Sequence, residues 1–269
     1  MQSNQQELNP QELNQQELNP QETNQAIKPT LAVLLAAGRG KRLRPWTDTV
    51  PKPLLPVHGR PTLDFTLQAL KQAGVEQVVF VVGHLGDQII DYIGNGSAWD
   101  IDPYFCEQTE LLGTAYALKM AADAHPHLFE QNHSMILTAT DYLIAPNALI
   151  DLVDRQQQIG ANLVVSLKRV PKEELSGRSS VRFSGDFELQ EIVEKPSEGE
   201  APSEFSASLT FILPSRIVKH LSQMQLSPRG EYEIQALINQ MIAEGATATG
   251  LLQPTPAEWD SSMVHPVEM

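Results

Sequence analysis

The sequence predicts an α/β fold in which helices flank a mostly parallel β-sheet. Short, continuous apolar runs alternate along the chain with longer segments of helical periodicity, and glycines close several of both. The first apolar run is LAVLLAA at residues 31–37, which Gly38 ends, and the first helical segment is TLDFTLQALKQA at 62–73, which Gly74 ends. Continuous apolar runs are typical of parallel strands buried on both faces, and strands that alternate with helices build a doubly wound sheet.

This alternation continues as far as residue 160. We expect further strands at 77–83, 104–108 and 134–141, and further helices at 87–94, 113–124 and 146–160. Ligands of doubly wound folds bind at the carboxyl ends of the strands. Functional residues are therefore expected in the loops that follow the strands.

The sequence changes in character after a further strand-like run, NLVVSLKRV at 162–170. Three strand-like segments follow, separated by Gly, Asp, Pro and Ser, at 180–183, 188–195 and 207–214. They predict a small β-rich portion that carries a hairpin and joins the main sheet. A last helix is expected at 231–245 and a last strand at 246–252.

The first 28 residues differ from the rest of the chain. QQELNPQELN at 5–14 is followed by the nearly identical QQELNPQETN, and the segment has no aromatic residue. Such a composition cannot bury enough apolar surface to fold alone. We expect residues 1–28 to form a disordered tail and residues 29–269 to form one domain.

The charge and the cysteine content exclude several classes of protein. The formal net charge is −14, which argues against binding to nucleic acid or to an anionic membrane surface. No apolar run is long enough to span a membrane. Cys106 is the only cysteine, so no disulfide can form within the chain, and a cytoplasmic location with a buried, structural thiol is expected.

Two neighbouring segments nevertheless gather glycines and basic residues. Gly38 and Gly40 lie directly after the first strand, where their backbone N–H groups could approach phosphate oxygens, and Arg42 could add a forked contact. Lys52 lies in PKPLLPV at 51–57, where prolines stiffen the backbone. A solvated surface turn would have the same composition, so each segment alone leaves both interpretations open.

The two segments together resemble a known family. LAAGRGKRLRPWTDTVPKPLLPVHGRPTLDFTLQAL is similar to the N-terminal signature of the sugar-1-phosphate nucleotidylyltransferases, also called nucleotide-sugar pyrophosphorylases. The glucose-1-phosphate thymidylyl- and uridylyltransferases and the mannose-1-phosphate guanylyltransferases share this signature. The resemblance continues through EQTELLGTAYAL, ATD and IVEKP. It implies a Rossmann-like fold of the nucleotide-diphospho-sugar transferase type, with the β-rich portion binding the sugar.

The resemblance also implies roles for individual residues on the nucleotide side. The glycine loop would surround a nucleoside triphosphate, Arg42 would bind its phosphates, and Lys52 would neutralise the reacting phosphates. Gln108 would read the base, and its amide offers a donor and an acceptor that suit uracil or thymine, so UTP or dTTP is favoured. The nucleotide-binding residues implied are Ala37, Gly38, Gly40, Arg42, Gln108, Gly113 and Thr114.

Further roles concern the metal and the sugar phosphate. Asp141 would bind Mg²⁺, a hard cation that prefers a few carboxylates together with substrate phosphates. Asp260 is a second candidate ligand. The resemblance implies Arg42, Lys52, Asp141 and Lys195 as catalytic residues. The residues implied to bind the sugar 1-phosphate are Ser179, Glu194, Lys195 and Ser208.

The chain departs from the family pattern at several of these positions. Ser179 stands where a glycine is typical, Leu209 replaces part of an Ala-Gly or Thr-Gly pair, and Thr140 replaces the glycine before Asp141. The C-terminal segment has Asp260 but lacks the Gly-Thr that usually follows, and another alignment places Ser262 at the ligand position. An altered sugar pocket and an impaired site are both compatible with these departures.

The resemblance implies a Mg²⁺-assisted reaction in which a sugar 1-phosphate attacks the α-phosphorus of an NTP in line, releasing pyrophosphate. The alternative is a catalytically weak paralogue that binds sugar nucleotides as a regulatory or partner subunit. An NAD-dependent enzyme is not expected, because the GxGxxG fingerprint is absent. The sequence leaves open the sugar, the base and whether the chain forms a homo-oligomer.

Overall fold

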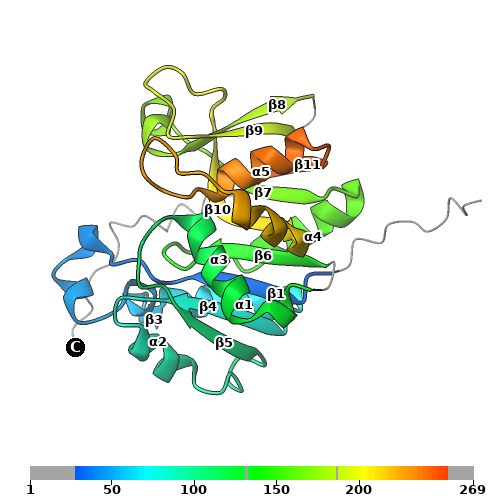
Figure 1. Cartoon of the computed structure of the whole chain (residues 1–269). Helices are drawn as coiled ribbons and strands as arrows, with labels where there is room; N and C mark the ends of the chain where they lie inside the picture. The colour runs from blue at the N-terminus through cyan, green and yellow to red at the C-terminus, as the bar shows by residue number, and fades with distance from the viewer. Residues whose placement is uncertain (1–27, 131–132, 186, 254–269) are drawn as a thin grey trace, which may run out of the picture.

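The computed structural model describes residues 28–130, 133–185 and 187–253. Its centre is a nine-stranded mixed sheet with helices on both faces, which confirms the predicted α/β class (Figure 1). The strands lie in the order β5-β4-β1-β6-β10-β7-β11-β9-β8. Asp260 and all of the predicted tail except Lys28 lie outside the described residues.

One half of the sheet is parallel, as the sequence predicts. In it Val33 lies opposite Val79 on one side and Leu137 on the other, and all three side chains are fully buried. Burial on both faces explains why these strands are continuous apolar runs. The four parallel strands are β5 (Asp102–Glu107), β4 (Gln77–Val82), β1 (Leu31–Leu35) and β6 (Ser134–Ala139).

The other half of the sheet is organised around an antiparallel strand, β10 (Phe205–Pro214), which lies between β6 and β7 (Leu163–Arg169). The sequence predicts most of β10 as part of the β-rich portion, whereas the structure places the strand in the middle of the main sheet. Phe211 and Ile212 explain this position, because both are fully buried and require cover on both faces of the strand.

The remaining strands complete the sheet beyond β7. β11 runs parallel to β7, and β8 and β9 form the antiparallel hairpin that the sequence predicts. β8 also pairs with β10, so the hairpin closes back onto the main sheet. These strands are β11 (Ala248–Leu252), β9 (Glu188–Glu194) and β8 (Ser179–Ser184).

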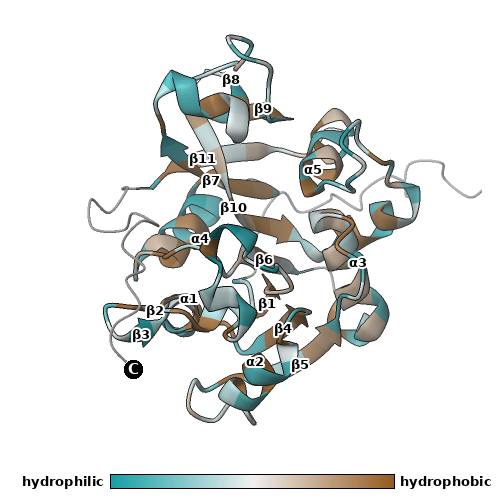
Figure 2. Ribbon diagram, turned by 90° about the vertical axis from the view of Figure 1, so that its left-hand side faces the viewer, coloured by the Kyte–Doolittle hydropathy of each residue, from teal (hydrophilic) through white to brown (hydrophobic). Residues whose placement is uncertain are grey.

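Helices cover the two faces of the sheet with two separate apolar layers. Figure 2 shows α1 and α4 on one side of the sheet and α3 and α5 on the other. α1 (Thr62–Ala73), α2 (Gly86–Ile93) and α4 (Ala148–Ile159) pack into one layer. α3 (Thr114–Ala124) and α5 (Ile234–Ala243) pack into the other.

Short elements that periodicity does not predict surround the first strand's loop. A small hairpin of β2 (Pro56–Val57) and β3 (Arg60–Pro61) follows three single turns of 3-10 helix. These turns are η1 (Lys41–Leu43), η2 (Trp46–Asp48) and η3 (Lys52–Leu54). Elsewhere the chain forms η4 (Pro126–Leu128), η5 (Lys172–Gly177) and η6 (Ser215–Gln223).

Cys106 is buried on β5, as the sequence predicts. Desolvation raises the pKa of its thiol to about 11. The thiol is therefore protonated at neutral pH and a poor nucleophile. None of the helices in the described part of the chain is both long and apolar enough to cross a membrane.

Candidate active site

A cleft of about 510 Å³ opens at the carboxyl ends of β1 and β6. Sequence segments far apart in the chain form its walls: the glycine loop, the start of α3 and the residues that follow β6. The cleft is lined by every residue that the resemblance implies for nucleotide binding, and also by Lys52, Asp141 and Leu209. The members of the cleft named in the sequence analysis are Ala37, Gly38, Gly40, Arg42, Lys52, Gln108, Gly113, Thr114, Thr140, Asp141 and Leu209.

The two glycines of the loop serve different purposes. Gly40 has a φ of 59°, and a Cβ there would lie 2.7 Å from Cγ2 of Thr47. Thr47 also donates a hydrogen bond to the carbonyl of Gly40 at 3.0 Å, so packing and backbone conformation both require this glycine. A Cβ at Gly38 would meet no atom of the described residues within 4 Å. Gly38 therefore leaves open space at the cleft wall rather than serving the packing of the protein.

The three basic residues of the loop, Lys41, Arg42 and Arg44, lie in two different environments. Arg44 forms an ion pair with Asp48 at 3.1 Å, and both side chains are more than half exposed. Lys41 and Arg42 instead line the cleft, and no carboxylate of the described residues pairs with either. Two unpaired cations at the cleft of an acidic protein are suited to an anionic ligand.

Gln108 is buried directly after β5 and also lines the cleft. Its backbone N–H donates to Val82 at 2.7 Å, which holds the residue beside the end of β4. Its side-chain amide donates to the carbonyl of Glu110 at 3.0 Å. Gln108 is therefore held in place by the chain while it faces the cleft, as a base-reading residue requires.

Gly113 and Thr114 connect the cleft to the segment before α5. A Cβ at Gly113 would overlap the backbone of Tyr232, whose carbonyl accepts a hydrogen bond from Ala115 at 2.9 Å. The hydroxyl of Thr114 accepts from the backbone N–H of Ile234 at 2.9 Å. This bond marks the start of α5, which begins three residues later than the sequence predicts. The glycine is thus required by this close approach, whatever ligand binds.

Lys52 and Asp141 both line the cleft and form an ion pair there. The first turn of η3 carries Lys52, and Asp141 comes two residues after the end of β6. Nζ of Lys52 lies 2.9 Å from Oδ2 of Asp141. Thr140 is buried and donates to the carbonyl of Leu35 at 3.1 Å, so the residue before Asp141 is tied to the end of β1.

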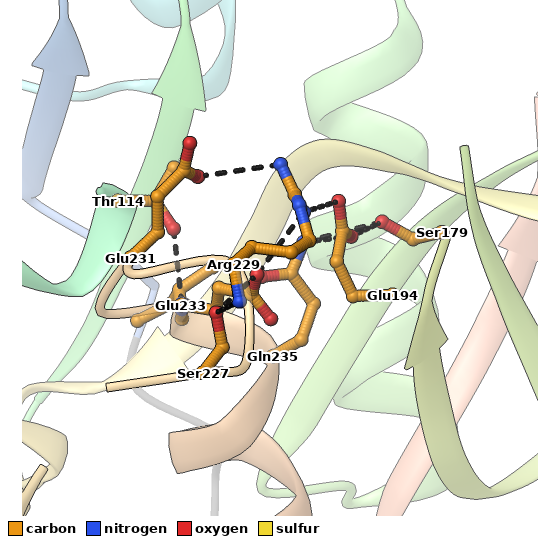
Figure 3. Close-up of polar contacts among 9 residues, drawn as sticks. Thr114, Ser179, Glu194, Ser227, Arg229, Glu231, Glu233 and Gln235 are labelled. Carbon is orange, nitrogen blue, oxygen red and sulfur yellow. Dashed lines mark hydrogen bonds and ion pairs between the residues drawn. The ribbon is translucent and has the colours of Figure 1, made fainter. Parts of the chain in front are cut away.

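Two of the residues implied to bind the sugar 1-phosphate, Ser179 and Glu194, belong to a separate cluster of polar side chains (Figure 3). Ser179 on β8 donates to Oε2 of Glu194 at the end of β9, and Gln235 on α5 donates to the same oxygen at 3.0 Å. Arg229 forms an ion pair with Oε1 of Glu194 at 3.1 Å. Both carboxylate oxygens of Glu194 are therefore engaged by protein groups.

The other two residues assigned to the sugar phosphate lie apart from this cluster. The side chain of Lys195 is exposed, its φ is 45°, and its backbone N–H donates to the carbonyl of Arg178 at 3.0 Å. Ser208 lies in the bulged part of β10, between Ala207 and Phe211, where the register to β7 shifts. Neither residue lines the cleft, whereas Leu209 does.

A comparison with known proteins decides the family. Residues 31–259 match the family described as Nucleotidyl transferase. The chain belongs to this family. UTP–glucose-1-phosphate uridylyltransferase AglF of Haloferax volcanii is 34% identical over 217 residues, which cover 80% of the chain and 85% of AglF. The low-salt glycan biosynthesis nucleotidyltransferase Agl11 of the same organism is 28% identical over 214 residues, 79% of the chain.

The match spans 57% of the length of Agl11, so this nucleotidyl transferase corresponds to little more than half of that relative. A crystal structure of UDP-glucose pyrophosphorylase complexed with UDP-glucose superposes with a TM-score of 0.72 at 21% identity, covering 83% of this chain and 90% of that one. At this level of identity the superposition confirms the fold.

Two groups of polar residues in this nucleotidyl transferase are absent from the sequence-based assignment. Arg229 pairs with Glu231 at 3.5 Å and with Glu233 at 3.0 Å, in addition to Glu194. The segment PRGEYE at 228–233 carries an arginine beside alternating glutamates, a signal that the helix assignment at 231–245 obscures. The second group is Tyr142, Thr138 and Thr210, whose hydroxyls bond to one another beneath Asp141.

Proposed function

We propose that this nucleotidyl transferase converts an NTP and a sugar 1-phosphate into an NDP-sugar and pyrophosphate. The observation that carries the proposal is the convergence, in one cleft, of the Lys52–Asp141 pair with Lys41 and Arg42, which pair with no carboxylate of the described residues. The open space at Gly38 and the held amide of Gln108 provide room and a polar contact for a nucleotide. Membership of the family supports the same reaction.

The reaction needs no general base, because the phosphate of a sugar 1-phosphate is already an anion near neutral pH. Its oxygen attacks the α-phosphorus in line, the bond from that phosphorus to the bridging oxygen breaks, and pyrophosphate leaves with the electron pair. The protein's contribution is position and charge. Arg42 and Lys41 bind the triphosphate at the loop, and Lys52 stabilises the charge that develops on the leaving pyrophosphate.

The donor chemistry at Asp141 fits Mg²⁺ bound in part by the substrate. The described residues contain no cluster of three or more His, Cys, Asp or Glu side chains that could hold a metal on their own. Mg²⁺ is commonly held by one or two carboxylates together with substrate phosphates, and Asp141 is half exposed at the cleft. When bound there, Mg²⁺ would neutralise phosphate charge. Asp260 lies outside the described residues.

Gln108 supports UTP or dTTP as the nucleotide. Uracil and thymine each present an imide N–H beside carbonyl oxygens, and a glutamine amide can donate to one and accept from the other. The name of AglF, a uridylyltransferase that acts with UTP, supports the same class of base. The sugar is less constrained, since Ser179 and Leu209 both depart from the family pattern.

A second candidate function is binding of sugar nucleotides without efficient turnover. Two observations favour it: Leu209 places an apolar side chain in the cleft, and both oxygens of Glu194 are engaged by Ser179, Gln235 and Arg229. A sugar hydroxyl would have to share or displace these contacts. A regulatory or partner subunit would tolerate this arrangement better than an enzyme.

A pyrophosphate-release assay separates the two functions. The purified chain would be incubated with Mg²⁺, with each of the four common NTPs or dTTP, and with a panel of sugar 1-phosphates. Catalysed release with one pair of substrates supports the enzyme. Calorimetric binding of an NDP-sugar without pyrophosphate release from any pair would support the second candidate.

A further inference from the structure

Lys168 is a lysine beside the cleft that the proposed reaction does not use. It lies at the carboxyl end of β7, one residue before the strand ends at Arg169. β6 and β7 both run antiparallel to β10, so their carboxyl ends lie at the same edge of the sheet. Lys168 is therefore at the edge where Asp141 follows β6, on the side of the β8–β9 hairpin.

Two charged groups act on the Lys168 ammonium, the guanidinium of Arg178 and the carboxylate of Asp141. Nζ lies 4.9 Å from the centre of the Tyr142 ring, and no carboxylate of the described residues forms an ion pair with it. Burial and the guanidinium of Arg178 lower the pKa of Lys168, and Asp141 opposes this shift. Asp141 is itself paired with Lys52, and Arg178 is paired with Glu174 at 2.9 Å.

A half-buried cation without a carboxylate partner is costly unless a ligand supplies the opposite charge. The Tyr142 ring compensates only in part, because cation–π contacts are weaker than charge-assisted hydrogen bonds. Lys195 is tied to the same region, since its backbone N–H donates to Arg178. Of Lys168, Arg178 and Lys195, only Arg178 forms an ion pair with an acid in the described part of the chain.

We propose that Lys168 binds an anionic oxygen group of the sugar 1-phosphate. This inference rests on the proposed function and identifies a further contact for one of its two substrates. Two groups of such a substrate have the required chemistry: the 1-phosphate itself, and a carboxylate on the ring of an acidic sugar. The ammonium donates to the anion, and its contact with the Tyr142 ring holds it in place.

The test compares Lys168→Met with Lys172→Met. Lys172 lies on the neighbouring η5 and is exposed. Removing its charge should not change the affinity for either substrate. Each variant is titrated calorimetrically with glucose 1-phosphate, with glucuronic acid 1-phosphate and with UTP. Lys168→Met should lower the affinity for at least one sugar phosphate by about 10- to 100-fold, which is the loss expected for a charge-assisted hydrogen bond. The affinity for UTP should not change. Lys168→Arg should retain most of the affinity.

The two ligands distinguish the source of the anion. An equal loss for both sugar phosphates assigns Lys168 to the 1-phosphate, and a larger loss for glucuronic acid 1-phosphate assigns it to the carboxylate. Affinities equal to those of Lys172→Met would overturn the proposal, and so would a loss confined to UTP. The melting temperature of Lys168→Met should not fall, because the change removes a desolvated charge.

The binding measurement keeps this inference separate from the proposed reaction. A wild-type chain that binds sugar phosphates but releases no pyrophosphate would contradict the reaction while Lys168 is still tested by affinity. A wild-type chain that releases pyrophosphate, combined with an unchanged Lys168→Met, would contradict the role of Lys168 alone.

Discussion

Nζ of Lys52 and Oδ2 of Asp141 lie 2.9 Å apart, although 89 positions separate the two residues in the chain. The two side chains are 26% and 50% exposed. Ion pairs this accessible contribute about 0–1 kcal/mol to stability. The pair is therefore better explained by the cleft that it lines than by the stability of the fold.

Asp141→Asn should abolish Mg²⁺-dependent pyrophosphate release while the protein stays folded. The change removes a ligand charge with almost no change in volume, and the lost ion pair contributes little stability. Turnover is measured across a range of Mg²⁺ concentrations, with Asp151→Asn on the exposed face of α4 as the control. Turnover like that of the wild type at saturating Mg²⁺ would remove Asp141 from the site.

Arg42→Ala and Arg44→Ala should differ sharply in nucleotide affinity. Arg42 lines the cleft and pairs with no acid in the described part of the chain, whereas Arg44 is paired with Asp48 and does not line the cleft. Arg42→Ala should lower the affinity for UTP or dTTP by about 10- to 100-fold, because a charge-assisted contact to phosphate is lost. Calorimetric titration without sugar phosphate measures this step, and equal effects of the two variants would contradict the assignment.

Gly38→Ala should lower nucleotide affinity, whereas Gly40→Ala should lower the stability of the fold. At Gly40 the positive φ and the contact with Thr47 predict a loss of about 1–3 kcal/mol in the free energy of unfolding. At Gly38 no atom would obstruct a methyl group, so stability should be retained while nucleotide affinity falls. Denaturant unfolding and nucleotide titration of both variants provide the two readouts. A stability loss at Gly38 as large as that at Gly40 would show that the open space is not reserved for a ligand.

Lys195→Ala should weaken the binding of the sugar 1-phosphate and leave NTP binding nearly unchanged. The resemblance assigns Lys195 to that ligand's phosphate, and its side chain is exposed at the end of β9 rather than on the cleft wall. Calorimetry with NTP first and sugar phosphate second resolves the two steps. Should the variant lose NTP affinity and keep its affinity for the sugar phosphate, the assignment would be wrong.

Deletion of residues 1–26 should leave the melting temperature and the turnover nearly unchanged. The repeat in this segment has no aromatic residue and cannot contribute an apolar core. Differential scanning calorimetry of the full and shortened chains provides the comparison. A large drop in melting temperature would show that the repeat packs on the domain.

The α/β class and most strands and helices could be predicted from local patterns. Runs such as LAVLLAA and VVFVV are apolar because neighbouring strands and helices bury them. The short 3-10 turns could not be predicted in the same way, because hydrogen bonds such as that between Thr47 and Gly40 shape them, not periodicity. The central place of β10 also escaped prediction, since strand order depends on pairing between distant segments.

The sequence by itself determined which residues form the glycine loop and which family the chain resembles, because those signals lie within contiguous motifs. Only the tertiary structure decided that Arg42 faces the cleft while Arg44 pairs with Asp48, and that Arg229 reaches Glu194. Neighbouring positions in one motif can point in opposite directions, and residues far apart in the chain meet only when the sheet brings their loops together. The direction of a side chain and its distant partners are properties of packing, which no local pattern records.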